Sequence, residues 1–194
     1  MRWTLLLLAV APAAAQAHLD TTGLGPVYDG VSHLLLSPDD LVPVLAMASL
    51  AGLNGPAAGR RTLFALTLAW LLGGLAGFAF GWPLLPEAVT IASFLALGAL
   101  VALDRRLAPT LVSSIAVALG LLHGWLNGAG IAGAGRELLA LLGIGGAIFV
   151  IVALAAASIT TLAHGWPRIA VRVLGSWVAA VGLLMLGWNL RGIA

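Results

Sequence analysis

The chain contains no cysteine and no lysine, and charged side chains are scarce along its whole length. They make up 8% of the residues, compared with about 25% in an average soluble domain. Without cysteine there is no disulfide, thiolate metal site or cysteine nucleophile, so a metal ligand must be a histidine, a carboxylate, an amide or the backbone. The nine arginines form no basic face, which argues against a nucleic-acid partner.

Apolar sequence fills most of the chain. Hydrophobic residues account for 61% of it, and the mean hydropathy is +1.10. Six apolar stretches approach or exceed the length of about 20 residues that a membrane-spanning helix needs. They cover residues 39–54, 62–81, 87–104, 110–127, 137–162 and 170–190. The pattern predicts an all-α, polytopic bundle of about six transmembrane helices in the lipid bilayer, forming a single domain over residues 18–194.

The first residues have the pattern of a secretory signal peptide. Arg2 gives a short basic region, residues 5–10 give an apolar core, and Ala15-Gln-Ala17 gives a small-residue cleavage site. We therefore expect residues 1–17 to be removed, which makes His18 the first residue of the mature chain. The alternative is an uncleaved anchor, for which the apolar core is short.

Arginines are concentrated on alternate connectors between the apolar stretches. The residues concerned are Arg60, Arg61, Arg105, Arg106, Arg168 and Arg172. Because arginine-rich loops stay on the cytoplasmic side, the pattern predicts a multi-pass protein of a bacterial inner membrane. Both the mature N-terminus and the C-terminus are then expected in the periplasm.

Glycine is abundant, with 25 residues, and is dense in Gly73-Gly74-Leu-Ala-Gly77 and Gly143-Ile-Gly145-Gly146. Small residues at such spacing let membrane helices approach each other closely. We therefore expect these glycines to serve helix packing in preference to a hinge or a pore lining.

One polar segment interrupts the apolar sequence, Gly30-Val-Ser-His33-Leu-Leu-Leu-Ser-Pro-Asp39-Asp40. A charged group at bilayer depth costs about 2.5–3.5 kcal/mol on insertion scales, so it is usually retained for a function. Ser37-Pro38 predicts a helix start, and Asp40 is placed to close a capping box with Ser37. Two adjacent carboxylates exceed the needs of a cap, so one of them is a candidate cation ligand.

The residues before this Ser-Pro break are too few to span a bilayer and predict a short outer half-helix. His33 lies on it, with Asp29 one turn earlier on the same face. A carboxylate so placed commonly orients a metal-binding imidazole. His33 is therefore a candidate ligand supported by Asp29, and the alternative is an interfacial histidine paired with Asp29.

A second histidine is expected at the same membrane level. His123 lies in the outer third of the fourth apolar stretch, one turn before Asn127. It is either a further ligand or a hydrogen-bonded packing residue. After cleavage, His18 would add an imidazole and a free amine, a pair able to hold copper or nickel.

Residues 30–45 resemble the opening helix signature of the HupE/UreJ family, hydrogenase and urease accessory membrane proteins regarded as nickel or cobalt permeases. In that signature a histidine is followed, six and seven residues on, by an Asp-His pair. His33 and Asp39 match it, and Asp40 stands where the second histidine is expected. Gly120-Leu-Leu-His123-Gly124 is similar to the family's later His-Gly motif. Phe64 fills a place where relatives often carry a histidine.

The resemblance implies a permease for a divalent transition metal ion, with nickel or cobalt as the first choice and copper or zinc as open alternatives. Its outward-facing site would contain His33, Asp39, Asp40 and His123, with Asp29 and His18 beside them. The second hypothesis is a non-transporting accessory or metal-delivery subunit, whose partners are metalloenzyme maturation proteins. No enzymatic activity is expected, because the spacing suggests no serine–histidine relay.

Overall fold

The computed structural model describes residues 22–81, 86–133, 135, 137–162 and 165–192. Over these residues it contains helices and no strand, which confirms the all-α prediction for the described part of the chain. The helices are α2 (Pro26–Leu36), α3 (Pro38–Leu53), α4 (Pro56–Phe80), α5 (Pro86–Leu103), α6 (Pro109–Ile131), α7 (Glu137–Thr160) and α8 (Trp166–Gly192). The expected signal peptide and His18 lie outside the described residues.

Proline is the first residue of α2, α3, α4, α5 and α6. Its missing N–H does not weaken a helix there, because the first turn leaves that group unpaired in any case. This explains why α4 already begins at Pro56 and includes Arg60 and Arg61, which the apolar pattern placed in a connector. At its other end α4 stops before Gly81, whose left-handed φ of 59° suits glycine.

Each of the six predicted apolar stretches is helical, as α3 to α8. By length and apolar composition, four of these helices can cross a membrane: α4, α6, α7 and α8. A fifth span results if α2 and α3 are counted as one span, although the chain bends by 77° between these two helices. The apolar part of α5, Glu87–Leu103, is shorter. The described chain therefore has the helices of a multi-pass membrane protein, with four or five of the six expected spans supported.

The predicted half-helix is present as α2, which has 11 residues. It ends at Ser37, whose extended backbone (φ −97°, ψ 95°) separates it from α3. The bend places Asp39 and Asp40 in the first turn of α3. Asp39 is exposed and Asp40 is buried, so these neighbouring carboxylates lie in different surroundings.

Close packing of glycine holds α4 against α6. A methyl group on Gly124 would overlap the carbonyl oxygen of Trp70, and one on Gly128 would overlap that of Gly74. In the opposite direction, a methyl group on Gly77 of α4 would overlap the carbonyl oxygen of Trp125 on α6. The paired positions rise together along both helices, so α4 and α6 are parallel. The predicted packing role is confirmed for Gly77, whereas it is wrong for Gly146, which is exposed and whose added Cβ would meet nothing within 4 Å.

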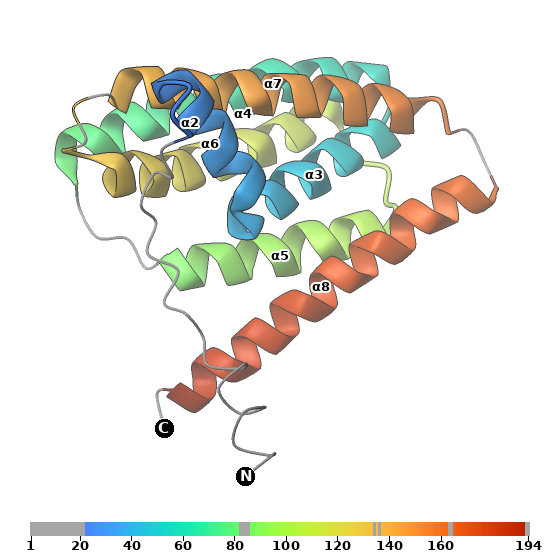
Figure 1. Ribbon diagram of the computed structural model, residues 1–194. Coiled ribbons are helices and arrows are strands. Elements are labelled where there is room, and N and C mark those ends of the chain that lie inside the picture. The colour runs from blue at the N-terminus through green and yellow to red at the C-terminus, as the bar shows by residue number, and fades with distance from the viewer. Residues whose placement is uncertain (1–21, 82–85, 134, 136, 163–164, 193–194) are drawn as a thin grey trace, which may run out of the picture.

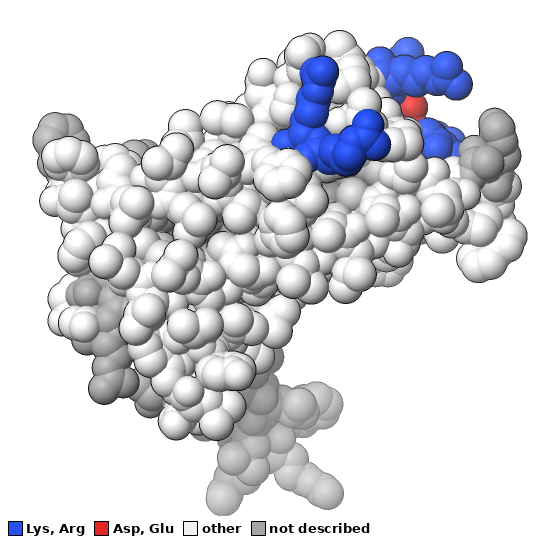
Figure 2. Space-filling model, turned by 90° about the horizontal axis from the view of Figure 1, so that it is seen from above, with Lys and Arg blue, Asp and Glu red and all other residues white. Residues whose placement is uncertain are grey.

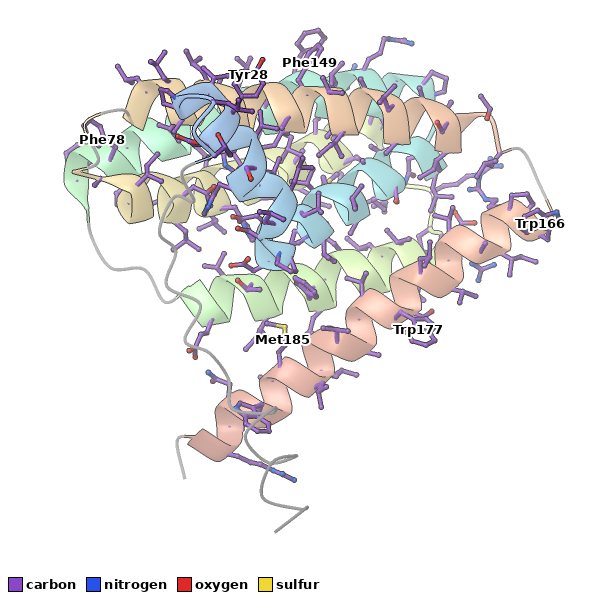
Figure 3. All side chains as sticks on the ribbon, viewed as in Figure 1. Tyr28, Phe78, Phe149, Trp166, Trp177 and Met185 are labelled. Atoms are coloured by element: carbon purple, nitrogen blue, oxygen red, sulfur yellow. The ribbon has the colours of Figure 1, made fainter. Side chains whose placement is uncertain are left out.

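The helices form two groups in Figure 1. Helices α4, α6 and α7 lie together at the top, whereas α5 and α8 pack against each other below, and α3 contacts both α5 and α7. Helix α8 is the least buried candidate span. Its residues Trp166 and Trp177 point away from the bundle (Figure 3) and are 78% and 71% exposed.

Arginines gather at one end of the molecule in Figure 2. We call this the arginine end; there α3, α5 and α7 finish and α4, α6 and α8 begin. The Arg168 guanidinium binds both carboxylate oxygens of Asp104 at 2.7 and 2.8 Å and donates to the carbonyl oxygen of Leu53 at 3.2 Å. It therefore fastens the beginning of α8 to the ends of α5 and α3.

Candidate functional site

A buried polar cluster lies where four helices meet. It consists of Asp40 from α3, Ser93 from α5, and His123 and Asn127 from α6, with the indole of Trp70 from α4 beside them. Exposure of these side chains is low, from 0% for Trp70 to 9% for Ser93. Buried polar groups normally need hydrogen-bond partners, and most of the atoms in this cluster supply them to one another.

Asp40 is the centre of the cluster. One carboxylate oxygen lies 2.8 Å from Nδ1 of His123, and the other accepts a hydrogen bond of 2.8 Å from Nδ2 of Asn127. The predicted capping box is wrong, because Ser37 makes no side-chain cap bond and both oxygens of Asp40 are directed at α6. At the start of α3 the Ser37 carbonyl accepts backbone hydrogen bonds from the N–H groups of Asp40 and Leu41.

Both ring nitrogens of His123 are engaged. Nε2 lies 2.9 Å from the hydroxyl of Ser93, which also lies 2.8 Å from the carbonyl oxygen of Val89. A serine hydroxyl has one proton, so it can bond to both groups only if it donates to Val89 and accepts from Nε2–H. Assigned in this way, the imidazole donates from Nε2 to Ser93, and one proton joins Nδ1 to the Asp40 carboxyl group across 2.8 Å. Ser93 then has no proton directed at His123, so it is not arranged as an activated nucleophile.

Two buried polar atoms near this network have no hydrogen-bond partner among the described residues: Nε1 of Trp70 and Oδ1 of Asn127. The Trp70 ring lies with its centre 5.5 Å from that of His123 and is tilted by 32° to it. An orphaned donor and an orphaned acceptor are unusual in a packed interior. Asn127 in particular anchors Asp40 through its nitrogen and leaves an amide oxygen available, a ligand type that divalent cations accept.

The predicted ligands are only partly brought together. Asp40 and His123 are in contact, as their shared membrane level suggested. Asp39 is within electrostatic reach of Asp40, His123 and His33, but it is exposed, and His33 on α2 is half-buried. Among the described residues, no three His, Asp or Glu side chains gather closely enough to hold one metal ion. The four predicted ligands are therefore not assembled around one point in this conformation.

Asp29 is buried and fastens the beginning of α2. Its carboxylate accepts bonds of 2.6 Å from both the backbone N–H and the hydroxyl of Thr22. Within the described part of the chain, the ring of His33 makes no hydrogen bond, so the expected Asp29–His33 pair is not formed. His18, the remaining predicted ligand, lies outside the described residues.

Sequence reasoning missed Ser93 and Trp70. Both lie in apolar helices, on α5 and α4, and neither spacing nor composition distinguishes Ser93 from the other serines of the spans. Asn127 carried a signal, because it follows His123 by one helical turn and shares its face. Asp40, which contacts both His123 and Asn127, is more than 80 positions away from them in the chain.

A family model described as HupE / UreJ protein matches residues 5–185. No curated protein and no solved structure matches the chain.

Proposed function

The chain belongs to the HupE/UreJ family, and we propose from this premise that it is a membrane permease for a divalent transition metal ion. Nickel or cobalt is the proposed cargo. The observation that carries the proposal is the buried cluster of Asp40, His123 and Asn127, because ionisable groups inside a membrane helix bundle are costly and usually mark an ion pathway.

The neighbouring carboxylates of α3 suggest how a cation would reach this cluster. Asp39 is exposed at the bend between α2 and α3, in electrostatic reach of His33, and would attract the cation first. The next residue, Asp40, is buried against α6. Successive residues of a helix point about 100° apart, so one turn of α3 presents a carboxylate to each environment.

A metal ion that enters the cluster would compete with the hydrogen bonds that Asp40 now makes with His123 and Asn127. Carboxylate oxygen and imidazole nitrogen are suitable ligands for nickel and cobalt ions. A metal ion at Asp40 and His123 would replace the proton that now joins them, since a ligating imidazole nitrogen must be deprotonated. The free oxygen of Asn127 is available as a third ligand. The bound cation would take the place of this proton, which would leave the cluster.

A non-transporting accessory or metal-delivery role is the second candidate. One observation favours it: His123 is only 1% exposed and Asp40 only 5%, so the cluster has no open contact with either side of the bundle. A subunit that receives metal from a maturation protein and holds it would need no through-going path. Both candidates fit an accessory or transport family, and neither involves catalysis.

Uptake of nickel or cobalt by proteoliposomes that contain only this protein separates the two candidates. The parent is expected to accumulate metal, and Asp40→Asn to reduce uptake at least about tenfold, because a lost metal ligand costs more than the 10–100-fold typical of supporting residues. Glu87→Gln is the matched control, since it removes an exposed carboxylate that bonds only to Asn189 among the described residues.

Transport is compared only between variants that are shown to be folded. Leaving a buried hydrogen-bonding group without its partner costs about 1–3 kcal/mol, so each variant is first checked for a monodisperse peak and a thermal transition. His123→Gln provides a second, neutral test of the same pair. If the parent binds metal but takes none up, the accessory role is correct. If folded Asp40→Asn and His123→Gln proteins transport like the parent, this cluster is not the site.

A further inference from the structure

A groove of about 780 Å³ opens near the arginine end, between the second and third turns of α4 and α6. Arg60, Arg61 and Phe64 line it from α4, and Ser113, Ser114 and Val117 line it from α6. This groove is separate from the polar cluster, which lies further along the same two helices.

The positive charge in the groove has no counter-ion among the described residues. Arg60 and Arg61 are both exposed and make no ion pair there, whereas Arg168 at the same end is paired with Asp104. Because α4 and α6 are parallel, the positive ends of both helix dipoles also face this end of the molecule. Two unpaired guanidinium groups about one turn from the positive ends of two helices favour an anion with several oxygens, and phosphate fits their fork-shaped donor geometry.

The wall of the groove is apolar on the side toward the middle of the helices. Phe64 is 57% exposed there and Val117 is 39% exposed. In a membrane protein this position, one to two turns inside a charged helix end, corresponds to the boundary between headgroups and acyl chains. A ligand that satisfies both parts of the groove needs a phosphate group and a hydrocarbon chain.

We propose that the α4–α6 groove is a binding site for an anionic phospholipid. The phosphate lies between Arg60 and Arg61, and an acyl chain lies along Phe64 and Val117. The bound lipid bridges the two helices that carry Trp70 and His123 and so stabilises the pair. This inference does not depend on the metal proposal, because no residue is shared between the two sites.

Native mass spectrometry of the full-length protein in detergent tests the site. The probes are dioleoylphosphatidylglycerol, which is anionic, and dioleoylphosphatidylcholine, which has the same chains and no net charge. The parent is expected to retain phosphatidylglycerol preferentially. The Arg60→Gln/Arg61→Gln variant should bind it about 30-fold more weakly, since each basic residue near an anionic lipid surface contributes roughly 1 kcal/mol.

The matched control is Arg105→Gln/Arg106→Gln, which removes the same charge from the same end of the molecule but outside the groove. It should change phosphatidylglycerol binding less than about twofold. Ser114→Trp keeps both arginines and fills the groove from an exposed position, so it should weaken binding as well.

Three results would overturn the proposal. Equal loss in both double variants would mean that diffuse surface charge attracts the lipid. Unchanged binding in the Arg60→Gln/Arg61→Gln and Ser114→Trp proteins would place the lipid elsewhere. Full displacement of phosphatidylglycerol by excess inorganic phosphate would show a site for a soluble anion, in which the acyl chain plays no part.

Discussion

Replacing Gly124 by alanine should loosen the contact on which the polar cluster depends. The residue lies in the second half of α6, one position after His123, and it faces the backbone of Trp70 on α4. An added Cβ would overlap the Trp70 carbonyl oxygen and lie 2.9 Å from both the carbonyl carbon and the Cα of that residue. Backbone atoms cannot rotate away as a side chain can, so the two helices would have to move apart.

The size of the effect follows from two opposing terms. Alanine is favoured over glycine inside a helix by about 0.5–1 kcal/mol. Overpacking of a close contact costs about 1–3 kcal/mol, and the rigid neighbour favours the upper part of that range. The matched control is Gly146→Ala on α7, because Gly146 is exposed and a Cβ there would meet nothing within 4 Å. Since the helix term is common to both variants, their difference isolates the overlap.

The assay is reversible unfolding in mixed detergent micelles, followed by tryptophan fluorescence and circular dichroism. We expect Gly146→Ala to be as stable as the parent or slightly more stable, and Gly124→Ala to be less stable than Gly146→Ala by about 1–3 kcal/mol. Metal binding should weaken only in Gly124→Ala, because it shifts His123 relative to Trp70. Equal stability of the two variants would refute the view that glycine contacts fix the spacing of α4 and α6.

Three further predictions concern the Arg168 ion pair, the N-terminus of the mature chain and the membrane topology. Arg168→Gln should lower the free energy of unfolding by about 1–2 kcal/mol, because it removes a two-point ion pair and a bond to a helix carbonyl; Arg172→Gln, which loses one bond to the Ala102 carbonyl, should cost clearly less in the same unfolding assay. Intact mass should give a mature chain that starts at His18, and a mass that retains the first residues would remove its free amine from any metal model. Reporter fusions should read cytoplasmic near Arg106 and periplasmic at the C-terminus, and a cytoplasmic C-terminus would mean that a span was miscounted.

Much of the fold was predictable because the bilayer imposes simple rules on sequence. Long apolar stretches must be helical where no water can satisfy the backbone, so all six stretches were correctly predicted as helices, and the bounds of all but α4 agree to within about four residues. The break at Ser37-Pro38 was predictable for a local reason, since proline at a first helical position and the short segment before it limit the backbone. The beginning of α4 was misplaced because Arg60 and Arg61 were treated as loop residues, although Pro56 had already started the helix.

The depth of the site in the membrane could be predicted from the sequence, but the contacts between its residues could not. Counting along α3 and α6 places Asp40 and His123 at the same depth, and the periodicity of α6 adds Asn127 to the face of His123. Which of Asp39 and Asp40 faces inward depends on how α3 is rotated about its axis. That rotation is set by packing against α5 and α7, and neighbouring residues of a single helix carry no information about it.

The sequence by itself therefore determined that the chain is a bundle of membrane helices, where most of them begin, and that a few ionisable residues lie among them. Only the tertiary structure decided which polar groups meet: the contact of Ser93 with His123, the indole of Trp70 beside the imidazole, and the Asp40 carboxyl group between His123 and Asn127 of α6. It also distinguished Arg168, which is paired with Asp104, from Arg60 and Arg61, which have no carboxylate partner in the described chain. The physical reason is that these contacts join residues far apart in sequence, through helix rotations and close glycine packing that are determined by all the helices together.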